Sequence, residues 1–117
     1  FGYKNSIIVP LDSFITGKPT HFTIQTIKKT TIKILDKTTL DRLIDSDTNI
    51  AKVWYNSLEN LVLQQIEREV DILTNSPKER YLRVLKRSPQ LFQEVPNKHI
   101  ASYLRMTPET LSRLKKS

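Results

Sequence analysis

The residues best suited to contact a ligand lie near the C-terminus, in the stretch TPETLSRLKK at positions 107–116. Thr107 can cap free backbone N–H groups at the start of a helix, Pro108 suits the first helical position, and Glu109 complements the positive helix end. One face of this helix is apolar and the other is polar. The polar face carries Glu109, Thr110, Ser112, Arg113, Lys115 and Lys116. Side chains of these types can bond to base edges and phosphates.

A second short amphipathic segment precedes this helix. Ile100, Ala101 and Leu104 recur one helical turn apart within residues 97–104, and Arg105-Met106-Thr107 links the two segments. Two short helices joined by a tight turn are typical of the helix-turn-helix, whose second helix enters the major groove of DNA. The alternative interpretation is an ordinary helical hairpin with a basic, solvated face.

A long periodic segment covers roughly residues 48–73, upstream of this hairpin. Its apolar residues recur every three or four positions without Gly or Pro, which predicts a helix of about 40 Å. We expect this helix to pair with a second copy of itself. The predicted dimer contacts are Ile50, Trp54, Leu58, Leu61, Val62 and Ile66. The alternative is a helix packed wholly within its own subunit.

Short helices are predicted on either side of this long helix. Asp36 is a candidate N-cap for the helix before it. After it, Ser76 and Glu79 form a capping-box pattern around Pro77, which predicts a new helix in a changed direction. The outward face predicted for this new helix carries Arg80, Arg83, Lys86 and Arg87. Leu91, Phe92 and Val95 are expected to form the core beneath the helix-turn-helix.

The first 35 residues favour strands. Residues 6–9, 21–27 and 30–35 are apolar or alternate between apolar and polar residues. Within residues 11–20 we expect one helical turn followed by a Gly/Pro turn. Because three short strands cannot close a sheet alone, we expect further strands before Phe1 or support from a partner. The predicted fold class is therefore α+β.

The charge of the chain is unevenly distributed. The net charge is +7. Residues 77–117 hold ten Lys or Arg and three acids, whereas residues 1–76 hold nine of each kind. A basic surface concentrated in one module indicates a polyanionic partner.

Composition also narrows the function classes. Because the chain has no cysteine, disulfides and thiolate metal ligands are excluded within these residues. No apolar stretch has the length of a membrane span and no signal peptide opens the chain, which predicts a soluble, cytoplasmic protein without a membrane partner. His21 and His99 lack companion ligands, and no catalytic constellation is visible, so we expect no enzyme and identify no metal or cofactor.

Two stretches, 96–104 and 107–113, read together with the order of the predicted parts, resemble the cyclic-AMP receptor protein and fumarate–nitrate regulator family of bacterial transcription factors, in its Bacteroidetes-type form. The resemblance implies that residues 1–47 are the C-terminal part of a cyclic-nucleotide-binding-like β-barrel and that residues 48–75 form the dimerisation helix and hinge. Residues 76–117 would then be a helix-turn-helix DNA-binding domain of winged-helix type with the wing absent. Since the chain starts without Met, the sequence suggests a fragment of such a protein.

The resemblance further implies a homodimeric, sequence-specific transcription regulator. Its partners would be a palindromic double-stranded DNA operator, a second copy of the chain and RNA polymerase. Glu109 and Arg113 match the family's base-reading residues, and Arg to guanine and Glu to cytosine are pairings that groove geometry favours. The residues expected at phosphates are Lys98, Thr107, Thr110, Ser112 and Lys116. The alternative function is a protein-interaction or assembly module that uses the long helix and the hairpin without reading DNA.

Several positions depart from the family pattern. Family members often carry Arg at the position of Pro108, so one base contact should be missing. Arg105 stands where the family commonly has Gly, so we predict either a positive φ at a cost of about 1 kcal/mol or a slightly opened turn. The positions that hold cyclic AMP in the family align with Pro10, Thr20 and His21. Without an Arg partner for the phosphate, we expect no cyclic-AMP binding in the family's manner, and an unknown small-molecule effector or none.

Overall fold

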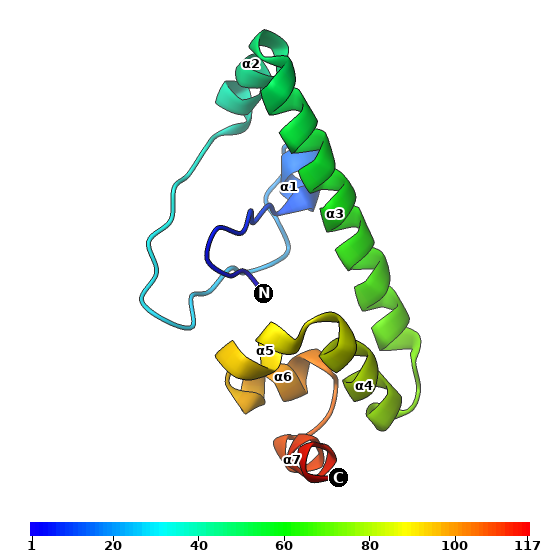
Figure 1. The fold of residues 1–117 in the computed structure, drawn as a ribbon. Helices are drawn as coiled ribbons and strands as arrows, with labels where there is room; N and C mark the ends of the chain where they lie inside the picture. Colours follow the sequence, from blue (N-terminus) through cyan, green and yellow to red (C-terminus); the bar gives the residue numbers. More distant parts are fainter. The chain divides into compact units, whose positions relative to one another are not determined.

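The computed structural model describes residues 1–117 and contains seven helices and no strand (Figure 1). The chain divides into two compact units, residues 1–60 and 61–117. The helices are α1 (Leu11–Thr16), α2 (Lys37–Ser46), α3 (Thr48–Leu73), α4 (Pro77–Arg87), α5 (Pro89–Glu94), α6 (Asn97–Tyr103) and α7 (Pro108–Lys116).

The predicted α+β class, with part of a β-barrel in residues 1–47, is wrong. Residues 6–9, 21–27 and 30–35 form no strand, and apolar side chains such as Phe22 and Ile34 are exposed. Alternating apolar and β-branched residues favour a strand because their side chains pack well on a pleated, half-buried sheet. Such a sheet forms only where neighbouring strands pair. No pairing of this kind forms in the first unit, so the pattern alone does not produce a sheet.

Two local predictions concern the helices of the first unit, the N-cap at Asp36 and the helical turn within residues 11–20. Asp36 caps α2 by accepting a hydrogen bond of 2.7 Å from the Thr39 amide, and the backbone and side-chain bonds from Thr39 lower the pKa of the Asp36 carboxyl. Gly17 ends α1 with φ 72°, in the left-handed region that glycine adopts without strain. The predicted N-cap and the predicted helical turn are both confirmed.

The long helix α3 has the predicted bounds, but its apolar residues differ in exposure. Ile50, Trp54, Leu58 and Leu61 are half-buried, and the Trp54 ring lies 5.3 Å from that of Phe14 within the first unit. By contrast, Val62 and Ile66 are 52% and 48% exposed. The six predicted dimer contacts therefore fall into two groups, four that are partly covered by the chain itself and two that are open.

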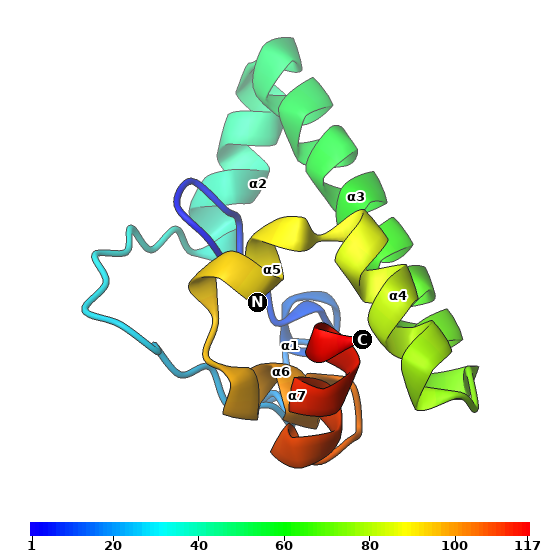
Figure 2. The same ribbon diagram turned by 60° about the horizontal axis from the view of Figure 1, so that its bottom comes forward.

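The second unit is built on a small apolar core. Ser76 caps α4 by accepting from the Glu79 amide at 3.3 Å, as the capping pattern predicts. Four short helices, α4 to α7, follow one another and pack together (Figures 1 and 2). The fully buried side chains of their core are Val84, Leu91, Ile100, Ala101, Leu104 and Leu111. Phe92 and Val95 pack against this core, partly buried, as expected.

A charge network joins α3 to α4 within the second unit. The carboxylate of Asp71 is 1% exposed and accepts hydrogen bonds from Arg83 Nε at 3.0 Å and from Arg87. Glu67, one turn earlier on α3, accepts from the same two arginines at 2.9 and 3.2 Å. The hydrogen bond to Asp71 raises the pKa of Arg87. The outward face predicted for α4 is therefore wrong at Arg80, which is buried. Arg83 is half-buried and Arg87 is exposed, although both bind acids on α3.

Candidate nucleic-acid interface

Helices α6 and α7 form a helix-turn-helix within the second unit (Figure 2). The predicted apolar faces meet, because Ile100, Ala101 and Leu104 are buried together with Leu111. Met106 packs against this core from the connecting turn. The polar face of α7 is left on the surface, because Glu109, Arg113, Lys115 and Lys116 are all exposed.

The turn between the two helices is a Schellman motif with Arg105 at the position where glycine is usual. The Met106 amide donates to the Ala101 carbonyl at 3.0 Å, and the Arg105 amide donates to the Ser102 carbonyl at 3.1 Å. Arg105 has φ 56°. The predicted positive φ is confirmed, and the turn closes without opening.

Relieving this backbone strain should stabilise the chain. We expect Arg105→Gly to raise the free energy of unfolding by about 0.5 to 1 kcal/mol, because glycine loses the left-handed penalty but adds freedom to the unfolded chain. Thermal unfolding followed by circular dichroism measures the change. Arg105→Ala is the control, since it removes the same side chain and keeps the penalty. Equal unfolding temperatures for the two variants would contradict the assigned strain.

Helix α7 begins with a hydroxyl cap. Thr107 accepts from the Thr110 amide at 3.2 Å, and the two hydroxyl oxygens lie 3.0 Å apart. The predicted capping role of Thr107 is confirmed. Both hydroxyls sit at the first turn of α7, where free backbone N–H groups and the helix dipole favour an anion. Their contact with phosphate stays a prediction.

The side chains of the two candidate base-reading residues have no partner within the chain. Glu109 and Arg113 stand four positions apart on α7 and are exposed, and their side chains form no hydrogen bond or ion pair with each other or with the rest of the chain. Lys98 and Lys116 are exposed and equally unpaired, whereas Ser112 is half-buried. Because no internal bond must break first, these four exposed side chains are available to a ligand.

Several cations of the second unit are used internally, which sequence reasoning did not foresee. Lys115 donates to Asn97 Oδ1 at 2.6 Å and lies 5.8 Å from the Phe92 ring centroid, so it joins α7 to α6 and α5. Residues 61–117 hold eleven Lys or Arg and six acids. The cations with partners inside the unit are Arg68, Arg80, Arg83, Arg87 and Lys115. Those without are Lys78, Lys86, Lys98, Arg105, Arg113 and Lys116.

In the first unit, an acid is bonded to two positions that the resemblance aligns with a phosphate site. The Asp12 carboxylate accepts from the Thr20 hydroxyl at 2.7 Å and from the His21 amide at 3.1 Å. These bonds, that of Thr20 foremost, lower the pKa of Asp12, so the carboxylate is ionised at neutral pH. A negative charge here would repel a phosphate. The expectation that the chain does not bind cyclic AMP in the family's manner stays a prediction.

Neither a membrane segment nor a metal centre is visible. None of the seven helices combines the length and apolar character that crossing a bilayer requires. No three His, Asp or Glu side chains converge as metal ligands would.

Comparison with known proteins adds no relative: no family model, no curated protein and no solved structure matches this chain. The helix-turn-helix geometry and the residues on α7 are therefore the grounds for a functional proposal.

Proposed function

We propose that the chain is a sequence-specific DNA-binding transcription regulator whose α7 reads bases in the major groove. The observation that carries this proposal is the exposed polar face of α7. Its apolar residue Leu111 is buried in the core, while Glu109 and Arg113 are exposed and unpaired on the opposite side. Arg can bond a guanine through two N–H groups, and Glu can accept from a cytosine amino group.

The surroundings of these two residues supply phosphate contacts. Lys98 at the start of α6, Arg105 in the turn and Lys116 at the end of α7 are exposed cations without internal partners. Phosphate contacts fix the register of a protein on the duplex, and base contacts supply the sequence preference. Both kinds of side chain are present on one short helical hairpin, which supports reading of a defined sequence.

Selection of bound duplexes from a random pool tests the proposal. We expect one sequence to be enriched, and the chain to bind that duplex about 10³-fold or more tightly than a scrambled duplex of the same composition. Equal binding to both duplexes would contradict sequence-specific regulation. Such a regulator would work in the cytoplasm, on a palindromic operator, with RNA polymerase as a further partner.

We further propose that a second copy of the chain pairs along α3. Within residues 61–73, Val62, Ile66, Val70 and Leu73 repeat at spacings of four, four and three and are all exposed, Leu73 at 72%. Such spacing places them on one face of the helix. Two protomers paired through this face would present two copies of α7 to the half-sites of a symmetric operator.

A single charged substitution on α3 tests whether the chain forms this dimer. We expect Ile66→Lys to shift the chain towards monomer by at least about tenfold in dissociation constant, because a lysine would be desolvated in the apolar seam. Sedimentation equilibrium measures the constant. Gln65→Lys is the matched control: it adds the same charge at the neighbouring exposed position, about 100° around the helix. Equal effects of the two substitutions would contradict pairing through this face.

The same exposed apolar residues favour one second candidate function, an assembly module that binds another protein. In that case Ile66→Lys would abolish partner binding, and the random-pool selection would return no preferred duplex. The two functions therefore give opposite results in the same selection experiment.

A further inference from the structure

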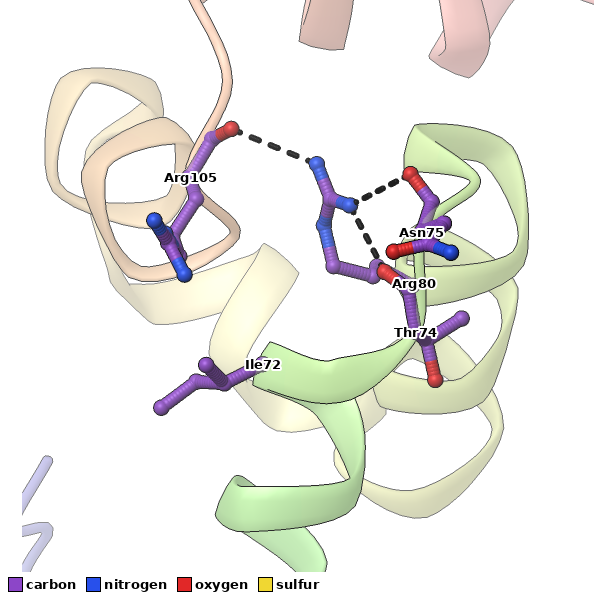
Figure 3. Close-up of a pocket in the computed structure, with 5 residues that line it drawn as sticks. All are labelled: Ile72, Thr74, Asn75, Arg80 and Arg105. Atoms are coloured by element: carbon purple, nitrogen blue, oxygen red, sulfur yellow. Dashed lines mark hydrogen bonds between the residues drawn. The ribbon is translucent and has the colours of Figure 1, made fainter.

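One buried arginine bonds to both places where the chain changes direction in the second unit. Arg80 of α4 is 9% exposed. Its Nη1 donates to the carbonyls of Thr74 at 2.8 Å and Asn75 at 2.9 Å, at the break between α3 and α4. Its Nε donates to the Leu104 carbonyl at 2.8 Å and its Nη2 to the Arg105 carbonyl at 3.3 Å, in the turn before α7. Figure 3 shows the guanidinium between these two stretches of backbone.

A second arginine completes this arrangement. Arg68 of α3 donates from Nη1 to the Tyr103 carbonyl and lies 3.9 Å from the centroid of the Tyr103 ring. Three consecutive carbonyls, those of residues 103 to 105, thus accept hydrogen bonds from two guanidinium groups. The last carbonyls of a helix have no partner within it and form its negative end, so cations stabilise them. The end of α6 is fixed from α3 and from α4 at once.

The shape of the guanidinium matters for this contact. Its planar fork presents five N–H donors in fixed directions, whereas a lysine ammonium is a single point of charge. A cavity of about 250 Å³ lies beside Arg80, lined by Ile72, Thr74, Asn75 and Arg105 (Figure 3). A lysine at position 80 would reach one pair of carbonyls only, and water could enter the cavity to solvate the others.

We propose that Arg80, with Arg68 beside it, is a positioning residue for base recognition. Arg80 holds the direction in which α7 leaves the turn, and base discrimination therefore depends on Arg80. Both arginines act through the backbone of the turn and not through contact with DNA. This inference rests on the proposed DNA-binding function. The inference adds a residue of α4 to the determinants of specificity, which the proposed function places on α7 alone.

Arg80→Lys in the complete chain tests the proposal, with Val84→Ala as the matched control. Val84 lies one turn further along α4, is buried in the core and contributes no bond to the turn. Both variants are compared at a temperature where circular dichroism shows them folded. We expect Arg80→Lys to lower the preference for the selected over the scrambled duplex by about tenfold. This effect is as large as that of losing one base contact. Val84→Ala should keep the preference, and scrambled-duplex affinity should be unchanged in both.

Amide exchange provides a readout that does not require DNA. The amides of Arg105 and Met106 are protected by the bonds of the turn. Arg80→Lys should speed their exchange by about tenfold more than Val84→Ala does. If the natural chain shows no duplex preference, the proposed function fails, and amide exchange still decides whether Arg80 holds the turn. Unchanged duplex preference in Arg80→Lys would overturn the inference whatever the exchange rates, and unchanged exchange would overturn the claim that Arg80 holds the turn.

If Arg80→Lys does not fold, Arg68→Gln takes its place. This substitution removes the bond to the Tyr103 carbonyl and the stacking on the ring, and leaves Arg80 intact. We expect a smaller fall in duplex preference, about threefold, and faster exchange at the same two amides. If Arg68→Gln changes neither the duplex preference nor the exchange of these amides, that result alone overturns the inference.

Discussion

Replacing Arg113 by alanine is expected to weaken binding to the selected duplex by about 1 to 3 kcal/mol and to leave binding to a scrambled duplex nearly intact. Arg113 is exposed on α7 and has no partner inside the chain, so its removal should neither unfold the hairpin nor release another side chain. Fluorescence anisotropy with the two duplexes measures both affinities. The expected signature is a loss of discrimination, with little change in general affinity for DNA.

Lys116→Ala is the matched control for this prediction. Lys116 is exposed, carries the same charge and lies three residues further along α7, where it is expected to contact phosphate. Its removal should weaken binding to both duplexes to a similar extent, because phosphates are the same in every sequence. Equal losses on both duplexes for Arg113→Ala as well would contradict its assigned role as a base-reading residue.

Replacing Asp71 by asparagine is expected to lower the free energy of unfolding by about 3 kcal/mol. The substitution keeps the size of the side chain but removes the charge that Arg83 and Arg87 both face. Asp71 is fully buried, so water cannot replace the lost interaction from the side of α3. Urea unfolding followed by circular dichroism measures the change.

Glu67→Gln is the comparison for Asp71. Glu67 binds the same two arginines but its side chain is 44% exposed, so solvent screens its charge and its loss should cost less than about 1 kcal/mol. Similar costs for the two substitutions would show that burial of Asp71 adds nothing to the network. The pair therefore separates the effect of burial from that of the ion pairs.

The sequence predicts the helices of this chain well because helical signals are local. Asp36, Ser76 and Thr107 each cap the helix that follows, and α3 spans the predicted residues 48–73. A cap acts over three residues and an apolar repeat over four, so both are visible in a short window. The positive φ of Arg105 is one of two outcomes that the family resemblance implies, because the family commonly has glycine at this turn.

The sequence fails where the outcome depends on distant residues. The strands expected in residues 1–35 require partners across a sheet, and an alternating pattern does not reveal whether partners exist. Arg80 and Arg83 lie on the charged side of α4, which in isolation indicates a solvated face. Their carbonyl and carboxylate partners lie up to 25 residues away in sequence. No local pattern distinguishes a buried arginine from an exposed one.

The internal use of arginine limits how many counterions the chain can displace from a duplex. Eleven cations in residues 61–117 would suggest a strong dependence of affinity on ionic strength, but five of them are bonded within the unit. Only Lys98, Arg105, Arg113 and Lys116 belong to the hairpin and are free. For a paired protein with eight such contacts, the logarithm of the binding constant should fall with the logarithm of salt concentration at a slope of about −7. Counting every Lys and Arg would give a far steeper line, because five of the eleven cations in this unit bond within the protein and not to its ligand.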